Sequence, residues 1–598
     1  MGLLAPQLEY ANRLKLHLQA FANSERAHIR TGNAKLATLI AGIVLAWISL
    51  KDHSVSAYWL ILPAVVYVGL ALLHHVVIRA RTLEERAEAF YRAGIARIED
   101  SWAGKGNSGE RFRNTQHVYA DDLDLFGPGS LFELLSGAQT PMGENRLAQW
   151  LLTPSPVAEI VERQKVVSEL REKLDLRELL AMTGADLAAR LDPESFVTWA
   201  ESTPELRKPI RWAAAIVLTL GSITTLIYFF QTSMLWPLAV VLTLQLILRG
   251  VLQERALRVI HGLKANAEGL ILFSEILKRF EQEQFTSPRL VELPALLRSG
   301  KRPASRAIRR LAQLVYWMDA QHGIFARTMD VPLLYTLHVA FLAEGWRKHW
   351  GRQVRAWVDA VAEMEALLSL AGYAYEHPDN VFPEFTASGN STPCFDGTAL
   401  GHPLIASSVC VRNDVLLDSR TRVLLVSGSN MSGKSTLLRT VGLSAVMAMA
   451  GAPVRAKSLR MKPLAVGTSI RLADSLQEGR SSFYTEILRI REVLELMKAE
   501  NTLLFLFDEL LEGTNSSDRR TGAEGLIRAL IDRGAIGIVT THDLALTEIT
   551  EPLGNVVRNV HLQDYVEDGK MRFDYKLRDG IVAKSNALEL MRLIGLDV

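Results

Sequence analysis

Four long apolar runs without a single Asp, Glu, Lys or Arg constrain the fold of this 598-residue chain more than any other feature. They occupy residues 36–50, 58–78, 212–230 and 234–248. The second and third runs are long enough to cross the hydrocarbon core of a bilayer, and the shorter first and fourth suit hairpin partners. Short connections join the runs in pairs. The pattern predicts two transmembrane helical hairpins, at residues 36–78 and 209–249, and the alternative is a set of helices buried in a soluble core.

Basic residues lie at the outer ends of both predicted hairpins, whereas the two connections carry one basic residue, Lys51. Under the positive-inside rule, this asymmetry predicts that each hairpin leaves the cytoplasm and returns to it. Both termini and the bulk of the chain are therefore expected in the cytoplasm, on a multi-pass membrane protein. The flanking basic residues are Arg26, Arg30, Lys35, Arg79, Arg81, Arg207, Lys208, Arg211 and Arg249.

The composition is that of a folded protein, because 48% of the residues are apolar and 22% are charged. The formal net charge of +2 neither requires nor excludes a nucleic-acid partner. The two cysteines, Cys394 and Cys410, are too few for a disulfide framework and lack the spacing of a zinc site. We expect both thiols to be reduced.

The patterning outside the apolar runs divides the chain into helical parts and a C-terminal α/β part. Leucines at three- and four-residue spacing predict helices from about residue 126 to 200, and the Arg-rich stretch 250–375 is predicted to be helical again. From about residue 385, β-rich runs such as 503–507 alternate with helical stretches, which predicts a parallel sheet with helices on both faces. The predicted parts are a cytosolic N-terminal helical arm (1–35), the first hairpin (36–78), an amphipathic helix and linker (79–125), a helical domain (126–208), the second hairpin (209–249), a further helical region (250–380) and the α/β domain (385–598).

The stretch 428-GSNMSGKS-435 fits the pattern G-x-x-x-x-G-K-[ST] between a predicted strand and a predicted helix. Glycines in such a loop allow backbone N–H groups to surround phosphates, and the following helix adds its positive end. Lys434 is expected to reach the β- and γ-phosphates, and the Ser435 hydroxyl to bind Mg²⁺. The sequence therefore predicts an ATP and Mg²⁺ site formed by Gly428, Ser429, Asn430, Met431, Ser432, Gly433, Lys434, Ser435 and Thr436.

Two further predicted strands end in residues suited to nucleotide hydrolysis. The apolar run 503-LLFLF-507 precedes Asp508 and Glu509. Asp508 is expected to bind Mg²⁺, and Glu509 to orient or activate the attacking water. A third strand ends at His542, which is expected to contact the γ-phosphate and respond to its loss.

Several of these segments resemble the MutS family of DNA mismatch-repair ATPases. The resemblance is carried by the P-loop at 430–440, a signature segment 479-GRSSFYTEI-487, 508-DELLEGTNSSD-518, 541-THD-543 and a C-terminal segment at 583–596, with weaker similarity at 129–167 and 361–379. It implies an ABC-like ATPase domain that follows an all-α MutS-core-like region and works as a dimer. Ser481 and Ser482 of one subunit would then complete the partner's ATP site, and double-stranded DNA would be a partner.

The chain also departs from that family. The family's N-terminal mismatch-reading domain has no counterpart here, and apolar hairpins stand where other members carry long DNA-clamping levers. The aromatic residue that stacks on adenine in the family is replaced by Cys410. These departures leave the DNA client and the preference for a base open.

A basic run at 298–310 is the best candidate for a nucleic-acid contact, because it contains no acidic residue. A DNA backbone, an anionic lipid surface and plain solvation are each compatible with it. Its basic residues are Arg298, Lys301, Arg302, Arg306, Arg309 and Arg310. The sequence thus favours a membrane-anchored, MutS-like ATPase that gates a dimer on DNA; the alternative is a membrane-tethered mechanochemical ATPase with a protein or lipid client. A transporter is disfavoured, because the apolar runs contain no charged residue.

Overall fold

The computed structural model describes residues 4–51, 56–206, 209–264, 267–297, 303–319, 330–386, 395–429, 431–470, 482–498, 502–512, 514–567 and 570–582. Several predicted site residues lie outside these ranges, namely Arg298, Lys301, Arg302, Asn430, Ser481 and the whole of segment 583–596, and the side chain of Ser482 is likewise not described. The chain forms two compact units. The first comprises Met1–Gly137, Leu147–Leu174 and Leu367–Val598, and the second Ala138–Arg146 and Asp175–Ala366.

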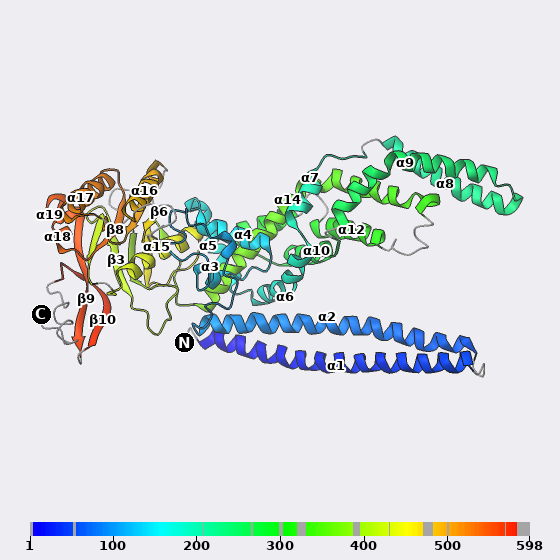
Figure 1. The fold of residues 1–598 in the computed structure, drawn as a ribbon, viewed down its shortest axis with the longest axis horizontal. Helices are drawn as coiled ribbons and strands as arrows, with labels where there is room; N and C mark the ends of the chain where they lie inside the picture. Colours follow the sequence, from blue (N-terminus) through cyan, green and yellow to red (C-terminus); the bar gives the residue numbers. More distant parts are fainter. Residues whose placement is uncertain are drawn as a thin grey trace. The chain divides into compact units, whose positions relative to one another are not determined.

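The first unit begins with two long helices that lie side by side, α1 (Leu4–Lys51) and α2 (Ile61–Ile98) (Figure 1). A short 3₁₀ helix, η1 (Ala57–Leu60), precedes α2. Both helices are much longer than the apolar runs within them, because the predicted N-terminal arm and the first run form one helix. The second run likewise continues without a break into the predicted amphipathic helix.

Four helices in the described part of the chain are long and apolar enough to cross a membrane by length and composition, namely α1, α2, α8 (Pro209–Thr232) and α9 (Trp236–Lys264). No more than 11% of the most apolar window of any of them is buried within the structure. The apolar side chains of these four helices are therefore largely exposed in this structure.

The second unit is helical, as the sequence predicts for residues 126–208 and 250–380. Helix α7 (Pro193–Glu201) begins at residues that favour a helix start. Asp192 caps it by accepting a hydrogen bond from the Glu194 N–H, and Pro193 occupies the first turn. Stacked tryptophans, Trp199 and Trp346, contribute to its core with ring centroids 6.1 Å apart. Besides α8 and α9, its helices include α6 (Leu174–Arg190), α7 (Pro193–Glu201), α10 (Ala267–Gln282), α11 (Pro288–Leu297), α12 (Ala304–Asp319) and most of α14 (Tyr335–Glu376).

The predicted α/β character of residues 385–598 is confirmed by a six-stranded sheet in the order β10-β9-β4-β8-β7-β6. Neighbouring strands are parallel except for the edge strand β10, which is antiparallel to β9. A second sheet, β1-β5-β2-β3, was not predicted. The strands are β1 (Glu384–Phe385), β2 (Phe395–Leu400), β3 (Asn413–Leu417), β4 (Val423–Ser427), β5 (Ser458–Met461), β6 (Leu464–Ser469), β7 (Thr502–Phe507), β8 (Ile536–Thr541), β9 (Val557–Glu567) and β10 (Lys570–Asp579).

Alternating side chains of β7 pack on opposite faces of the six-stranded sheet. Phe505 and Phe507 are fully buried in one core cluster with residues of α16 (Ser482–Glu495) and α17 (Ser516–Asp532). Leu506 points to the other face, where α15 comes so close that a Cβ on Gly442 would lie 3.0 Å from it. Helices therefore cover both faces. The helices around this sheet and preceding it are α3 (Leu131–Leu135), α4 (Pro141–Leu152), α5 (Val157–Arg171), α15 (Lys434–Ala450), α16 (Ser482–Glu495), α17 (Ser516–Asp532), α18 (Leu544–Thr547) and α19 (Thr550–Leu553), with 3₁₀ turns η2 (Glu110–Phe112), η4 (Leu496–Lys498) and η5 (Gly554–Val556).

Candidate nucleotide-binding site

The loop at residues 428–433 connects the end of β4 to the first turn of α15. Gly433 caps the helix with φ of +98°, a left-handed conformation that favours glycine. A Cβ at this position would also lie 3.0 Å from the Tyr575 ring. The loop therefore delivers the backbone directly into the N-terminus of α15, where free N–H groups favour an anion.

Lys434 follows this glycine, and its side chain is only 4% exposed. Its Nζ donates hydrogen bonds to the carbonyl oxygens of Gly428 and Ser429, at 2.9 and 3.0 Å, which fold the lysine back over the loop. The Ser429 and Ser432 hydroxyls are buried without a hydrogen-bond partner among the described residues. Buried hydroxyls of this kind, beside a lysine and a helix N-terminus, suit the binding of phosphate oxygens.

The two predicted carboxylates follow directly from β7, and Thr540 of the neighbouring strand β8 positions both. The Thr540 hydroxyl donates to the Asp508 carboxylate at 2.5 Å and accepts a hydrogen bond from the Glu509 N–H at 3.0 Å. Glu509 has φ of +51°, an unusual conformation for a residue with a side chain. Its carboxylate lies 3.6 Å from Lys434 Nζ. The parallel pairing of β7 and β8 therefore brings Glu509 to the loop.

His542 lies between two carboxylates. Its Nδ1 is 3.2 Å from Glu509 Oε2, and its Nε2 is 3.8 Å from Glu512 Oε1. Partial burial opposes ionisation of Glu509, but the hydrogen bond to Glu512 and the charges of Lys434 and His542 together lower its pKa. The same hydrogen bond, with partial burial, raises the pKa of Glu512. Of the two carboxyl groups, Glu509 therefore loses its proton more readily.

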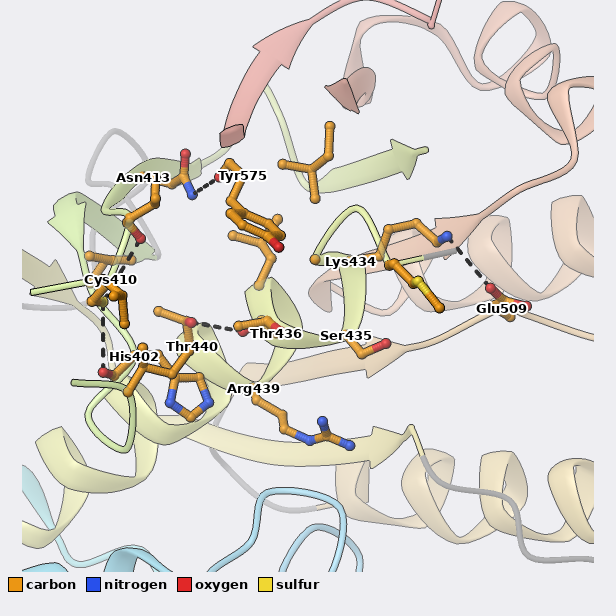
Figure 2. A pocket seen from close by; sticks show the side chains of 18 residues that line it. His402, Cys410, Asn413, Lys434, Ser435, Thr436, Arg439, Thr440, Glu509 and Tyr575 are labelled. Carbon is orange, nitrogen blue, oxygen red and sulfur yellow. Dashed lines mark hydrogen bonds and ion pairs between the residues drawn. The ribbon is translucent and has the colours of Figure 1, made fainter. Parts of the chain in front are cut away.

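Lys434 and Glu509 line a cavity of about 710 Å³, within the range of small-molecule sites, whereas Asp508 and His542 are not part of its wall. In Figure 2, Lys434 and Glu509 lie at one end, whereas His402, Cys410 and Asn413 lie at the other. One end of the cavity is thus formed by a lysine–glutamate pair and the other by residues without a formal charge at neutral pH. Its wall includes Leu400, His402, Ile405, Val409, Cys410, Val411, Asn413, Met431, Gly433, Ser435, Thr436, Leu437, Arg439, Thr440, Leu562 and Tyr575 besides Lys434 and Glu509.

Tyr575 is a cavity residue that the sequence analysis missed. It has φ of +55° and lies where the pairing of β10 with β9 is irregular, between Phe573 and Leu577. Asn413 fixes this strand, because its Nδ2 donates to the Tyr575 carbonyl and its Oδ1 accepts from the Leu577 N–H. An aromatic ring thus lines the same cavity as Cys410, the residue that replaces the expected aromatic. No local motif around Tyr575 signals this position.

His402 is a second cavity residue without a sequence signal. It is buried, and its Nδ1 accepts a hydrogen bond from the Leu404 N–H at 3.2 Å. Burial, reinforced by the positive charges of Arg439 and Arg455, lowers the pKa of His402 to about 4. The imidazole is therefore neutral at physiological pH.

The other predicted site residues differ in where they lie. Ser435 and Thr436 line the cavity. Ser482 is described only as the first residue of α16. Arg306, Arg309 and Arg310 are exposed on α12 of the second unit. The structure places these arginines on one solvent-facing side of a helix, as a surface patch and not as part of the cavity wall.

The part of the chain that forms this site is similar to known proteins. Residues 424–597 match the family model of MutS domain V. The chain is 31% identical over 239 residues to the DNA mismatch repair protein MutS of Streptococcus uberis, which covers 40% of this chain and 28% of that protein. It is 37% identical over 203 residues to the Endonuclease MutS2 of Thermus thermophilus, covering 33% of this chain and 25% of that protein. The chain thus spans about a quarter of the length of these relatives.

Proposed function

We propose that this protein is a membrane-anchored ATPase that uses the binding and hydrolysis of ATP to close and reopen a dimer. The observation that carries the proposal is the convergence of Lys434 and Glu509 on one end of a nucleotide-sized cavity, at a distance of 3.6 Å. Similarity of this part of the chain to MutS domain V supports the same conclusion.

Each residue around Lys434 has a role in this proposal. Lys434 and the backbone N–H groups of the loop bind the phosphates, and the Ser435 hydroxyl and the Asp508 carboxylate would hold Mg²⁺ with the oxygen ligands it prefers. Mg²⁺, when bound, neutralises charge on the phosphate oxygens. Glu509 accepts the proton of the attacking water, and His542, held against Glu509, responds to the γ-phosphate.

The adenine base lies against Tyr575 in this proposal. The P-loop fixes the phosphates at the Lys434 end, so the base extends toward the end formed by His402, Cys410 and Asn413, and the Tyr575 ring lies between the two ends (Figure 2). A tyrosine face provides the stacking surface that the Cys410 position does not.

Replacement of Tyr575 by Ala is expected to raise the Kd for ATP about tenfold, because stacking of a base on an aromatic ring contributes roughly 1–3 kcal/mol. The Kd for inorganic tripolyphosphate, which has no base, should not change. Tyr565→Ala on β9 is a matched control, since Tyr565 is 41% exposed and is not part of the cavity wall. Equal loss of affinity for both ligands would place the base elsewhere.

We include dimerisation in the proposal because Ser481 and Ser482 would complete the ATP site of a partner subunit. Ser482 starts α16, and a helix start is suited to donate N–H and hydroxyl groups to a phosphate of the partner's ATP. ATP bound between two subunits would then hold the dimer closed, and hydrolysis would release it.

The four apolar helices support anchoring in a lipid bilayer. Their most apolar windows are at most 11% buried, and a bilayer is the partner that matches continuous apolar surface on helices of this length. The cytoplasmic placement of the ATPase part follows from the basic residues at the outer ends of both hairpins.

Double-stranded DNA is the client that we propose, because both relatives compared above carry names of DNA-processing proteins. The exposed Arg306, Arg309 and Arg310 are the available cationic patch. The alternative, a protein or lipid client without DNA, is favoured by the apolar hairpins, which a soluble DNA enzyme does not need.

Duplex binding by the detergent-solubilised protein separates these clients. We expect matched and mismatched duplexes to bind with an affinity that falls steeply with salt and changes with ATP. Replacement of all three arginines by Gln should reduce the salt slope, because fewer phosphate contacts release fewer counterions. Absence of binding at low salt, in every nucleotide state, would exclude the DNA client and leave the membrane or protein client.

A further inference from the structure

The base of the α1/α2 hairpin is anchored in the first unit by an aromatic cluster. Tyr10 of α1 and Tyr91 of α2 are fully buried, with ring centroids 5.5 Å apart. Tyr10 also contacts Tyr375, near the end of α14, at a centroid distance of 5.5 Å. Gly94 makes this packing possible, since a Cβ there would lie 2.3 Å from the Tyr10 ring. The hairpin is thus held firmly where it meets the rest of the unit.

A buried ion pair reinforces the same junction. Arg97, in the last turn of α2, donates two hydrogen bonds to the Glu376 carboxylate, at 2.6 and 2.7 Å. The Glu376 side chain is 1% exposed, and it also accepts a hydrogen bond from the Tyr10 hydroxyl at 3.3 Å. A two-pronged pair of this kind fixes direction as well as distance.

Asp100, just beyond the end of α2, contacts the wall of the nucleotide cavity. Its Oδ2 accepts a hydrogen bond from the Ser407 N–H at 2.8 Å, and its Oδ1 lies 4.0 Å from Arg455 Nη2. Ser407 is in the middle of the segment 400–413, which supplies seven of the cavity-lining residues. The carboxylate at the end of the hairpin is therefore bonded to the backbone of the cavity wall.

Arg455 extends this connection to the wall residues themselves. Its guanidinium, 4% exposed, donates to the carbonyl oxygens of His402 and Ile405, at 3.2 and 2.5 Å. Both residues line the cavity. The Arg455 carbonyl also accepts a hydrogen bond from the Gly401 N–H at 2.8 Å. A single buried arginine thus holds the wall segment and faces Asp100.

We propose that the Asp100–Arg455 contact couples the N-terminal helical hairpin to the base-binding end of the nucleotide cavity. The proposal rests on the function proposed above and names the regulation of that same site. A displacement of α2 at its base moves Asp100, and with it the wall segment that carries His402, Ile405 and Cys410. Because binding linkage is reciprocal, occupation of the cavity acts back on the hairpin by the same factor.

The contacts predict which ligands change their affinity through this coupling. The wall segment lies at the uncharged end of the cavity, whereas Lys434 and Glu509 lie at the other end (Figure 2). Asp100 and Arg455 are therefore positioning residues for the base and not for the phosphates. A change in the hairpin should alter the affinity for ATP without altering the affinity for inorganic tripolyphosphate.

The experiment compares Asp100→Asn with wild type in the full-length, detergent-solubilised protein. We expect the Kd for ATP to rise by about fivefold or more, the lower end of typical couplings between sites, with the Kd for tripolyphosphate unchanged. Glu99→Gln is the matched control, because it removes the same charge from the neighbouring residue, whose side chain is exposed and accepts from Gln7. Arg455→Lys should restore part of the ATP affinity that Arg455→Ala loses.

A second variant tests whether the hairpin acts through Asp100. Gly94→Ala forces Tyr10 away from α2 at a point that does not touch the cavity. It should raise the Kd for ATP, and its effect should be smaller in the Asp100→Asn background, since interacting positions are not additive. Unchanged ATP affinity in Asp100→Asn, equal loss for both ligands, or additive effects would each overturn the coupling. Failure of the wild-type protein to bind ATP would instead overturn the proposed function.

Discussion

Replacement of Glu509 by Gln is expected to reduce the turnover of ATP by about a thousandfold, in the range of a lost general base. The glutamine keeps the shape of the side chain and the backbone bond to Thr540, but it cannot accept a proton from water. The Kd for ATP should change little, because Lys434 and the loop remain in place. Steady-state turnover and equilibrium binding, measured on the same preparation, give the two quantities.

The neighbouring Glu512 provides a sharp control for this result. Its hydrogen bond to Glu509, with partial burial, raises the pKa of Glu512, whereas the pKa of Glu509 is lowered. Glu512→Gln keeps a hydrogen-bond donor toward Glu509 and should retain most of the turnover. The reverse outcome, with Glu512→Gln inactive and Glu509→Gln active, would exchange the roles that we assign to the two residues.

Much of the α/β domain could be predicted from sequence, because its signals are local. The loop before Lys434 and the carboxylates after β7 are contiguous motifs, and each follows a strand that is buried on both faces and therefore uniformly apolar. The order of the strands could not be predicted in this way. The antiparallel edge strand β10 and the second sheet depend on pairings between distant segments, such as Phe395 with Met461.

The contribution of Tyr575 to the cavity could not be predicted either. Tyr575 lies at an irregular point in β10, whose conformation depends on two hydrogen bonds with Asn413 of the other sheet, one donated to the Tyr575 carbonyl and one accepted from the Leu577 N–H. Asp100 and Arg455 lie far apart in sequence, and neither belongs to a recognisable motif. Contacts made by tertiary structure alone leave no periodic or spaced pattern for a sequence to reveal. The long apolar helices, in contrast, could be predicted, because an uninterrupted run of uncharged apolar residues is visible in the sequence without any tertiary contact.

The second large effect that we expect is a loss of stability in mild acid, caused by two buried histidines. Burial lowers the pKa of His377 to about 4, and burial with nearby arginines does the same for His402. In the unfolded chain both should titrate near about 6.5. Between these values the unfolded state binds more protons than the folded state, so the free energy of unfolding falls as the pH falls through this window.

The size of the expected loss of stability follows from the size of the two histidine pKa shifts. Each histidine should cost about 2 kcal/mol of stability between pH 7.5 and pH 5, and about 4 kcal/mol together, since one pKa unit corresponds to about 1.4 kcal/mol. His377→Phe isolates one contribution. The phenyl ring can keep the contact with Tyr373, whose ring centroid is 4.6 Å away, and it removes a buried Nε2 that has no hydrogen-bond partner in the described chain.

Denaturant unfolding at the two pH values measures the expected difference. The acid-induced loss should be about 2 kcal/mol smaller in His377→Phe than in wild type, whereas His261→Gln, at an exposed position on α9, controls for the loss of a histidine as such. An unchanged loss in His377→Phe would mean that His377 is not held neutral by burial.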